Sequence, residues 1–452
     1  MTASRPDLPF RLERDPVGEV RVPAEALYGV QTARALDNFQ VSTLRIHPLF
    51  ITGYAEVKKA AALANMETGA LTREKGEAVV QAASEILAGG LRDQFRLDVF
   101  QAGAGTSYNM NVNEVIANRG LELLGASRGE YAWLEPNDDV NKSQSTNDTM
   151  PTAMRLAAVR LLRELTGALD RLGETFGAKA DEFADVRKAG RTHLHDATPM
   201  SLGEEFRAWG ASVRRAADRI RAVEHALVEV PLGGTAIGNS VNTKPEYPAL
   251  VVRCLAEITG LPLREASDRV QSTQSVGDFV ALSAALRVAA VELSKIANDL
   301  RLLNSGPHTG LAEIELPALQ PGSSIMPGKV NPAVAEMLNM VCYHVIGHDT
   351  AITFAAEAGQ LEVNVMMPYI AYALFESLDI FTSAVGHFDE RCVRLIKADR
   401  ARCAEYAERS VGLAALHNER LGFMGAAELA QRAIDTGKTI GELAGEPEGA
   451  RG

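Results

Sequence analysis

The strongest constraint on the fold of this chain is a set of long segments whose apolar residues recur every three or four positions. The pattern is clearest from Met154 to Leu172, where leucine, valine and methionine share one helical face. Further apolar-rich segments of this kind span residues 206–228, 279–303, 332–356 and 368–393. Each is long compared with an average helix of about 11–12 residues. These segments predict an all-α fold built around an elongated helical bundle.

Composition and charge narrow the classes of function. The net charge of −12 disfavours nucleic acid as a partner, because phosphates require a basic surface. It also repels anionic substrates, so an anion would have to be attracted by a local cluster of donors and cations. The N-terminus lacks the apolar stretch of a signal peptide, and charged or polar residues interrupt every long apolar region. We therefore expect a cytoplasmic protein without a membrane partner.

The four cysteines predict neither disulfides nor a metal centre. Their spacing contains no C-x-x-C pair or other metal-binding pattern. We expect reduced, mostly buried thiols in a reducing compartment. The residues are Cys254, Cys342, Cys392 and Cys403.

Small polar residues gather between the predicted helices. At the ends of a rigid helical scaffold, backbone N–H groups and hydroxyls can face an anion, so these segments are candidate site loops. The segments are GAGTSYNMN (103–111), NKSQSTND (141–148), GRTHLHDATP (190–199), PLGGTAIGNS (231–240) and QPGSSIMPGKVNP (320–332).

Two of these segments have a plain structural alternative. Residues 322–332 combine two glycines, two serines, a lysine and an asparagine, which suits a loop that closes over an acid but also a flexible helix connection. Residues 143–148 offer three hydroxyls, two amides and a carboxylate before a long helix, which also suits N-capping alone.

The histidine pair in the third segment does not predict a zinc site. His193 and His195 are two positions apart and would not share a helix face. A single titrating or charged imidazole fits the pattern better. The sequence also lacks a nucleophile elbow, a Rossmann fingerprint, an EF-hand loop and a zincin helix, which argues against nucleotide, metal and acyl-enzyme chemistry.

The segment GSSIMPGKVNP (322–332), below called the signature loop, resembles the signature loop of the aspartase/fumarase superfamily. Gly328 and Val330 distinguish it from the argininosuccinate and adenylosuccinate lyase branches. The resemblance covers residues from about 10 to about 440. Further similar segments follow in the same order: residues 23–39, 103–119, 140–148, 190–199, 233–243 and 356–365.

Within the superfamily the sequence resembles the aspartase branch more than class II fumarases. Fumarases usually carry Trp at the position of Tyr28, and commonly Ser and Gln at the positions of Ala104 and Ser107. Residues 355–361 also look like the aspartase version. The resemblance implies deamination of L-aspartate to fumarate and ammonia, with hydration of fumarate to L-malate as the alternative. A catalytically silent relative is a further alternative, but Ser323, Lys329 and His193 are all present.

Two residues depart from both branches, and the chain ends early. His195 and Glu204 stand where glutamine is usual. The resemblance implies three helical domains at residues 1–140, 141–394 and 395–452, the last of them shorter than is typical. It further implies a homotetramer whose central five-helix bundles form a twenty-helix core, with each active site shared between three subunits.

The resemblance also assigns the site residues. Those that would bind the small dicarboxylate substrate are Thr106, Ser145, Thr146, Asn147, Thr192, Ser324 and Asn331. Lys329 and His193 would hold the carboxylate remote from the reaction, and Glu336 matches the glutamate that pairs with this histidine. Ser323 matches the base that removes the β-proton to form an aci-carboxylate. Judged by pKa alone, His193 is the rival base.

We expect no cofactor and no metal among the site residues. A divalent cation such as Mg²⁺ is expected at most as an activator.

Overall fold

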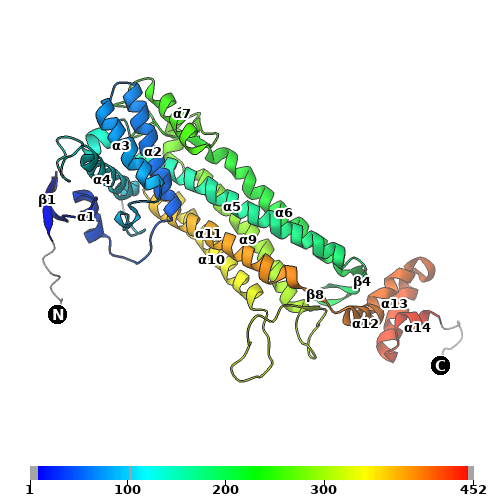
Figure 1. The fold of residues 1–452 in the computed structure, drawn as a ribbon. Coiled ribbons are helices and arrows are strands. Elements are labelled where there is room, and N and C mark those ends of the chain that lie inside the picture. Colours follow the sequence, from blue (N-terminus) through cyan, green and yellow to red (C-terminus); the bar gives the residue numbers. More distant parts are fainter. Residues whose placement is uncertain (1–8, 102, 446–452) are drawn as a thin grey trace. The chain divides into compact units, whose positions relative to one another are not determined.

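The computed structural model describes residues 9–101 and 103–445. Within these residues helices dominate, and the strands form two-stranded sheets (Figure 1). The helices are α1 (Val30–Asn38), α2 (Pro48–Glu67), α3 (Arg73–Leu87), α4 (Thr106–Leu123), α5 (Thr146–Glu182), α6 (Leu202–Leu227), α7 (Tyr247–Thr259), α8 (Arg269–Gln274), α9 (Gly277–Leu303), α10 (Ala333–Glu357), α11 (Met367–Arg391), α12 (Arg400–Arg409), α13 (Asn418–Thr436) and α14 (Ile440–Ala444). Short 3-10 or π-helical turns lie at Arg92–Gln94, Gly103–Gly105, Pro136–Val140, Val393–Leu395 and Val411–His417.

The strands pair locally. The antiparallel pairs are β1 (Phe10–Asp15) with β2 (Gly18–Pro23), β3 (Arg187–Thr192) with β4 (His195–Ser201), and β7 (Ile314–Glu315) with β8 (Lys397–Ala398). The pair of β5 (Glu229–Val230) and β6 (Arg264–Glu265) is parallel.

The predicted long helices are confirmed as α5, α6, α9, α10 and α11. On α5 the residues that set the apolar period, from Met154 to Leu172, are buried. Burial of one continuous apolar face is what holds long helices together in a bundle. The all-α prediction is therefore confirmed, while the division into three domains remains a prediction.

The chain separates into two compact units. The first comprises Met1–Glu164, Arg219–Arg287 and Val345–Asp379, and the second comprises Leu165–Asp218, Val288–His344 and Ile380–Gly452. In the first unit, α2 packs against α3 and α7. Its core includes edge-to-face contacts of Phe50 with Tyr54 and Tyr108, whose ring centroids lie 5.1 and 5.3 Å away.

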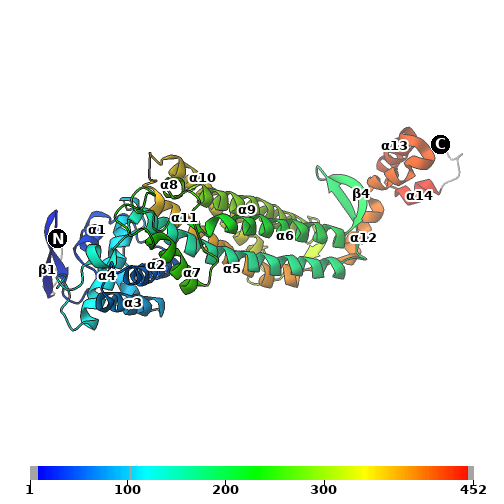
Figure 2. The same ribbon diagram turned by 90° about the horizontal axis from the view of Figure 1, so that it is seen from above.

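In the second unit, the parts of α5 and α6 that belong to it run side by side in both views (Figure 1 and Figure 2). Phe206 of α6 packs against two rings. Phe176 belongs to α5 and lies 6.0 Å away between ring centroids, and Phe183 directly follows α5 and lies 5.1 Å away. Near the C-terminus a smaller core forms around Leu429, Ile440 and Leu443.

All four cysteines are buried free thiols, as predicted. Within the described ranges, no helix has the length and apolarity needed to cross a membrane.

The segment 190–199, expected to be a loop, instead forms most of the β3–β4 hairpin. Thr192 pairs with His195, so His193 and Leu194 alone make the turn. Their φ angles of 55° and 61° match a tight two-residue turn, which requires positive φ at both central positions. The expectation failed because neither residue is a typical turn residue.

Candidate active site

An open pocket of about 410 Å³ in the first unit gathers polar side chains from the segments predicted to form site loops. Three predicted substrate-binding residues, Thr106, Ser145 and Thr146, line it. The other lining residues are Gln31, Asn109, Met110, Asn137, Asn141, Ser143, Gln144, Thr235, Ala236, Val241 and Asn242. We call this the amide pocket, because Asn and Gln are the most frequent residues in its lining. Hydroxyls and amides can donate hydrogen bonds to a carboxylate.

Strained backbone surrounds the amide pocket. Ser143, Thr235 and Asn242 line it and have φ angles of 61°, 57° and 65°, in the left-handed region that L-residues seldom adopt. Such conformations cost about 1–3 kcal/mol each and cluster at functional sites. The strain thus marks the pocket as a candidate site independently of its polar residues.

A left-handed backbone segment also sets the start of α4. Gly103, Ala104 and Gly105 have φ angles of 73°, 54° and 89°, so the chain turns sharply before the helix begins at Thr106. At Gly105 a Cβ atom would lie 2.6 Å from Sδ of Met150. Thr106 is consequently presented at the helix N-terminus, and its Oγ1 donates to the carbonyl of Gly103 at 2.6 Å.

Asp148 ties two walls of the amide pocket together. Its buried carboxylate accepts hydrogen bonds from the backbone N–H groups of Ser145 at 2.9 Å and of Gly233 and Thr235 at 3.0 Å. Burial raises the pKa of Asp148 to about 6, against the opposing effect of these bonds. Ser145 Oγ also accepts from the N–H of Asn147 at 3.2 Å, so the segment 143–148 caps α5 and lines the pocket as well.

Asn147 points to a neighbouring loop. Its Nδ2 donates to the carbonyl of Ala236 at 2.7 Å, and the residue is not part of the pocket lining. The structure thus places Asn147 beside the amide pocket, next to Thr146.

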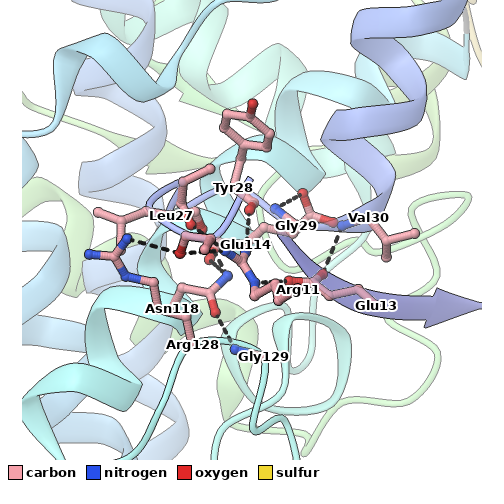
Figure 3. A network of polar contacts seen from close by, with 12 residues as sticks. Arg11, Glu13, Leu27, Tyr28, Gly29, Val30, Glu114, Asn118, Arg128 and Gly129 are labelled. Carbon is pink, nitrogen blue, oxygen red and sulfur yellow. Dashed lines mark hydrogen bonds and ion pairs between the residues drawn. The ribbon is translucent and has the colours of Figure 1, made fainter. Parts of the chain in front are cut away.

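A carboxylate network fixes α1, which supplies Gln31 to the pocket. Glu114 accepts from the backbone N–H groups of Gly29 at 2.9 Å, Gln31 at 2.8 Å and Thr32 at 3.1 Å. Figure 3 shows Glu13 beside it, accepting from the N–H of Val30 at 2.8 Å. The first N–H groups of a helix have no partner within it, so the two glutamates replace an N-cap.

Thr192 and His193 lie at the exposed tip of the β3–β4 hairpin in the second unit. Below the tip, Arg191 forms a two-pronged ion pair with the fully buried Glu313, at 2.8 and 3.2 Å. A buried carboxylate requires such partners, so this pair holds the hairpin firmly. The ion pair therefore anchors the strand two residues before His193.

The signature loop is closed at its base. The N–H of Gly322 donates to the carbonyl of Lys329 at 2.7 Å, and Nδ2 of Asn331 donates to the carbonyl of Gly322 at 2.8 Å. Ser323 Oγ accepts from the N–H groups of Ile325 at 3.2 Å and Met326 at 3.0 Å. Ser324 and Lys329 are exposed. The loop thus holds Ser324 and Lys329 toward solvent, whereas Ser323 is half-buried.

Glu336 lies in the first turn of α10, which begins at Ala333 just after the signature loop. One of its carboxylate oxygens lies 3.9 Å from Nη2 of Arg301, a partly exposed and therefore weak ion pair. Its predicted pairing with His193 stays a prediction.

The sequence of this chain is similar to those of known lyases. The model of a protein family described as "Lyase" matches residues 18–347. An aspartate ammonia-lyase from a Bacillus species is 48% identical over 433 residues, which cover 96% of this chain and 92% of the relative. The aspartate ammonia-lyase of Escherichia coli K12 is 48% identical over 437 residues, covering 96% and 91%. The chain belongs to the aspartase/fumarase superfamily of lyases.

Solved structures agree with this membership. The fumarate lyase:delta crystallin of Brucella melitensis, in a crystal bound to cobalt, aligns with a TM-score of 0.94 and 48% identity over 96% of this chain and 95% of that one. The class II fumarase of Schistosoma mansoni also aligns with a TM-score of 0.94 over 96% and 95%, but with 34% identity. The aspartase/fumarase fold predicted from the signature loop is thereby confirmed.

The superfamily motifs fall into three groups within this chain. Thr106, Ser145 and Thr146 meet in the amide pocket, with Asn147 beside them. Thr192 and His193 occupy the hairpin tip. The signature loop carries Ser323, Ser324, Lys329 and Asn331. Between the hairpin tip and the signature loop, no hydrogen bond joins described residues. The roles of these residues remain predictions.

Sequence reasoning missed a buried lysine behind the amide pocket. Lys58 of α2 is fully buried, and its ammonium contacts the side chains of Asn109, Asn141 and Gln144. The available signal was a lysine at a core position of an alanine-rich helix, in the run AEVKKAAALA (55–64). A lysine is almost never fully buried unless it is paired, so such a position deserves a functional explanation.

Proposed function

We propose that the protein is an aspartate ammonia-lyase, which interconverts L-aspartate with fumarate and ammonia. The observation that carries this proposal is 48% identity over 96% of the chain to relatives named aspartate ammonia-lyase. The class II fumarase that shares the fold is 34% identical. Tyr28, Ala104 and Ser107, which match the aspartase branch, support the same choice.

The reaction removes a weakly acidic proton from the carbon beside a carboxylate. The electron pair of the C–H bond moves into that carboxylate to give an aci-carboxylate dianion, and then forms the double bond while the C–N bond breaks. The ammonium group leaves as neutral ammonia, so no acid has to protonate it. Stabilising the negative charge of the intermediate is the main catalytic task.

The hydroxyls of the amide pocket suit that task. Thr106, Ser145 and Thr146 would surround the reacting carboxylate, together with Ser324 of the signature loop. The remote carboxylate would be held by Thr192, His193, Lys329 and Asn331. Asn147 would contact the amino group.

Ser323 is the proposed base. Its Oγ already accepts two backbone hydrogen bonds, from Ile325 and Met326, which would stabilise an alkoxide. Lys329 in the same loop adds a positive charge, and closure of the loop would exclude water. His193 is then a charged binding group that Glu336 supports.

We propose that more than one chain contributes to a complete site. The three groups of motif residues lie in separate parts of the polypeptide, and symmetric assembly can bring such segments from different copies together. The proposed assembly is a homotetramer with a twenty-helix core, in which three subunits share each active site.

The proposed reaction uses no cofactor. The residues that line the amide pocket include no carboxylate, imidazole or thiolate, which are the side chains that usually bind catalytic divalent metals. A cation such as Mg²⁺ would therefore act as an activator outside this pocket. The buried free thiols support a cytoplasmic, reducing location.

A substrate panel tests the proposal. L-Aspartate should give the ultraviolet absorbance of fumarate, whereas L-malate and argininosuccinate should not. A signal from L-malate without one from L-aspartate would make the protein a class II fumarase. Lack of turnover with every acid would identify a catalytically silent relative.

A further inference from the structure

A buried ammonium lies directly behind the amide pocket. Lys58 Nζ contacts Oδ1 of Asn109 at 2.7 Å, Oε1 of Gln144 at 2.9 Å and Oδ1 of Asn141 at 3.0 Å. An ammonium has three protons to donate and cannot accept. Three carboxamide oxygens therefore satisfy it fully, and no water is needed.

This arrangement dictates how the amides lie. All three partners of Lys58 line the amide pocket, and each must turn its oxygen toward the ammonium. Their NH2 groups then face other acceptors: Asn109 Nδ2 donates to Oδ1 of Asn141 at 3.1 Å, and Gln144 Nε2 donates to the carbonyls of Val140 and Lys142 at 3.0 Å. Without Lys58, no single donor would keep the three amide oxygens turned toward the same point.

The charge of Lys58 is only partly compensated. Its hydrogen-bond partners are neutral amides, and the nearby carboxylate of Asp148 is engaged by three backbone N–H groups. The ring of Tyr54 lies 5.9 Å from Nζ. Burial lowers the pKa of Lys58 to about 7, and Asp148 opposes that effect. A second negative charge close by would therefore be favourable.

The pocket otherwise lacks positive charge. Its lining contains no lysine, arginine or histidine, and the whole chain carries a net charge of −12. In a buried setting a charge acts more strongly than in water, because the effective dielectric constant is lower. Lys58 is thus well placed to attract an anion into this pocket.

We propose that Lys58 is a positioning residue of the amide pocket: its ammonium orients Asn109, Asn141 and Gln144 and supplies the positive charge that holds a carboxylate of the substrate there. The inference rests on the proposed function and adds to it a residue that lies outside the segments that resemble the superfamily. Lys58 acts through the amides and through the electrostatic field of its ammonium, without touching the substrate.

The test measures binding of succinate, a four-carbon dicarboxylate without a leaving group, to the assembled protein by titration calorimetry. Lys58→Met should weaken succinate binding by at least about tenfold, a loss of about 1.4 kcal/mol. The control is the adjacent Lys59→Met, which removes a half-buried lysine of the same helix and should change binding by less than about twofold. Unchanged binding by folded Lys58→Met would overturn the inference.

Gln144→Glu gives a second test that keeps the lysine. The new carboxylate would neutralise Lys58 directly without changing the packing, so succinate binding should weaken and the KM for L-aspartate should rise more than kcat falls. If Lys58→Met does not fold, unchanged succinate affinity in Gln144→Glu overturns the inference. Wild-type protein that neither binds succinate nor converts L-aspartate overturns the proposed function and the inference together. A loss confined to the variants of Lys58 and Gln144 supports both.

Discussion

Asn331 closes the signature loop by donating a hydrogen bond from Nδ2 to the carbonyl of Gly322 at 2.8 Å. At Gly322 a Cβ atom would lie 2.8 Å from the carbonyl oxygen of Lys329 and 2.9 Å from the N atom of Asn331. Because both neighbours are backbone atoms, the loop would have to open to admit a side chain at this position.

We expect Gly322→Ala to lower kcat/KM for L-aspartate by about 100-fold, since a shift of about 1 Å in catalytic groups has that effect. Steady-state kinetics with a thermal-unfolding control measures this. Gly386→Ala on α11, where a Cβ atom meets nothing within 4 Å, is the matched control and should leave activity unchanged. Equal activity in the two variants would contradict the role of the closed loop base.

Ser323→Ala should abolish turnover and leave the assembly intact. The hydroxyl accepts bonds only from Ile325 and Met326 of its own loop, among the described residues, so its loss should disturb no core packing. Turnover and size-exclusion chromatography with light scattering measure the two effects. Near wild-type turnover would assign the base elsewhere, with His193 as the first candidate.

Lys329→Ala should mainly raise the KM for L-aspartate, by about 10- to 100-fold, because a desolvated charge pair with a carboxylate is worth a few kcal/mol. The exposed Lys397→Ala on β8 serves as the control for loss of one positive charge. An unchanged KM in Lys329→Ala would exclude this lysine from substrate binding.

Glu114 predicts a pH-dependent contribution to stability. Burial raises its pKa from 4.5 to about 7, so the folded state binds more protons than the unfolded state between these values. The contribution is therefore complete below about pH 4.5 and is lost as the pH rises through about 7, by on the order of 3 kcal/mol.

The variant Glu114→Gln removes this titration. We expect the urea midpoint of the wild type to fall, relative to that of Glu114→Gln, when the pH is raised from 5 to 8. A difference that stays constant, or that shifts in favour of the wild type, would contradict the raised pKa.

The sequence predicts those features that depend on neighbours along the chain. The leucine spacing of residues 154–172 predicts α5 because burial on one face follows from local periodicity. The signature loop is recognised by its own residues. Lys58, in contrast, finds partners 51 to 86 positions away, and Arg191 finds Glu313 122 positions away. Contacts between residues so far apart produce no periodic pattern in a single sequence, so they could not be predicted from it.

We propose that each active site combines segments of different subunits. Thr146→Ala and Ser323→Ala, each inactive alone, can be dissociated together and reassembled, so that mixed tetramers form. If Thr146 and Ser323 of one site come from different chains, about one quarter of the sites will contain both wild-type segments, and about one quarter of wild-type activity with L-aspartate should return. Failure of activity to return at any mixing ratio, with mixed tetramers shown to have formed, would contradict the shared site.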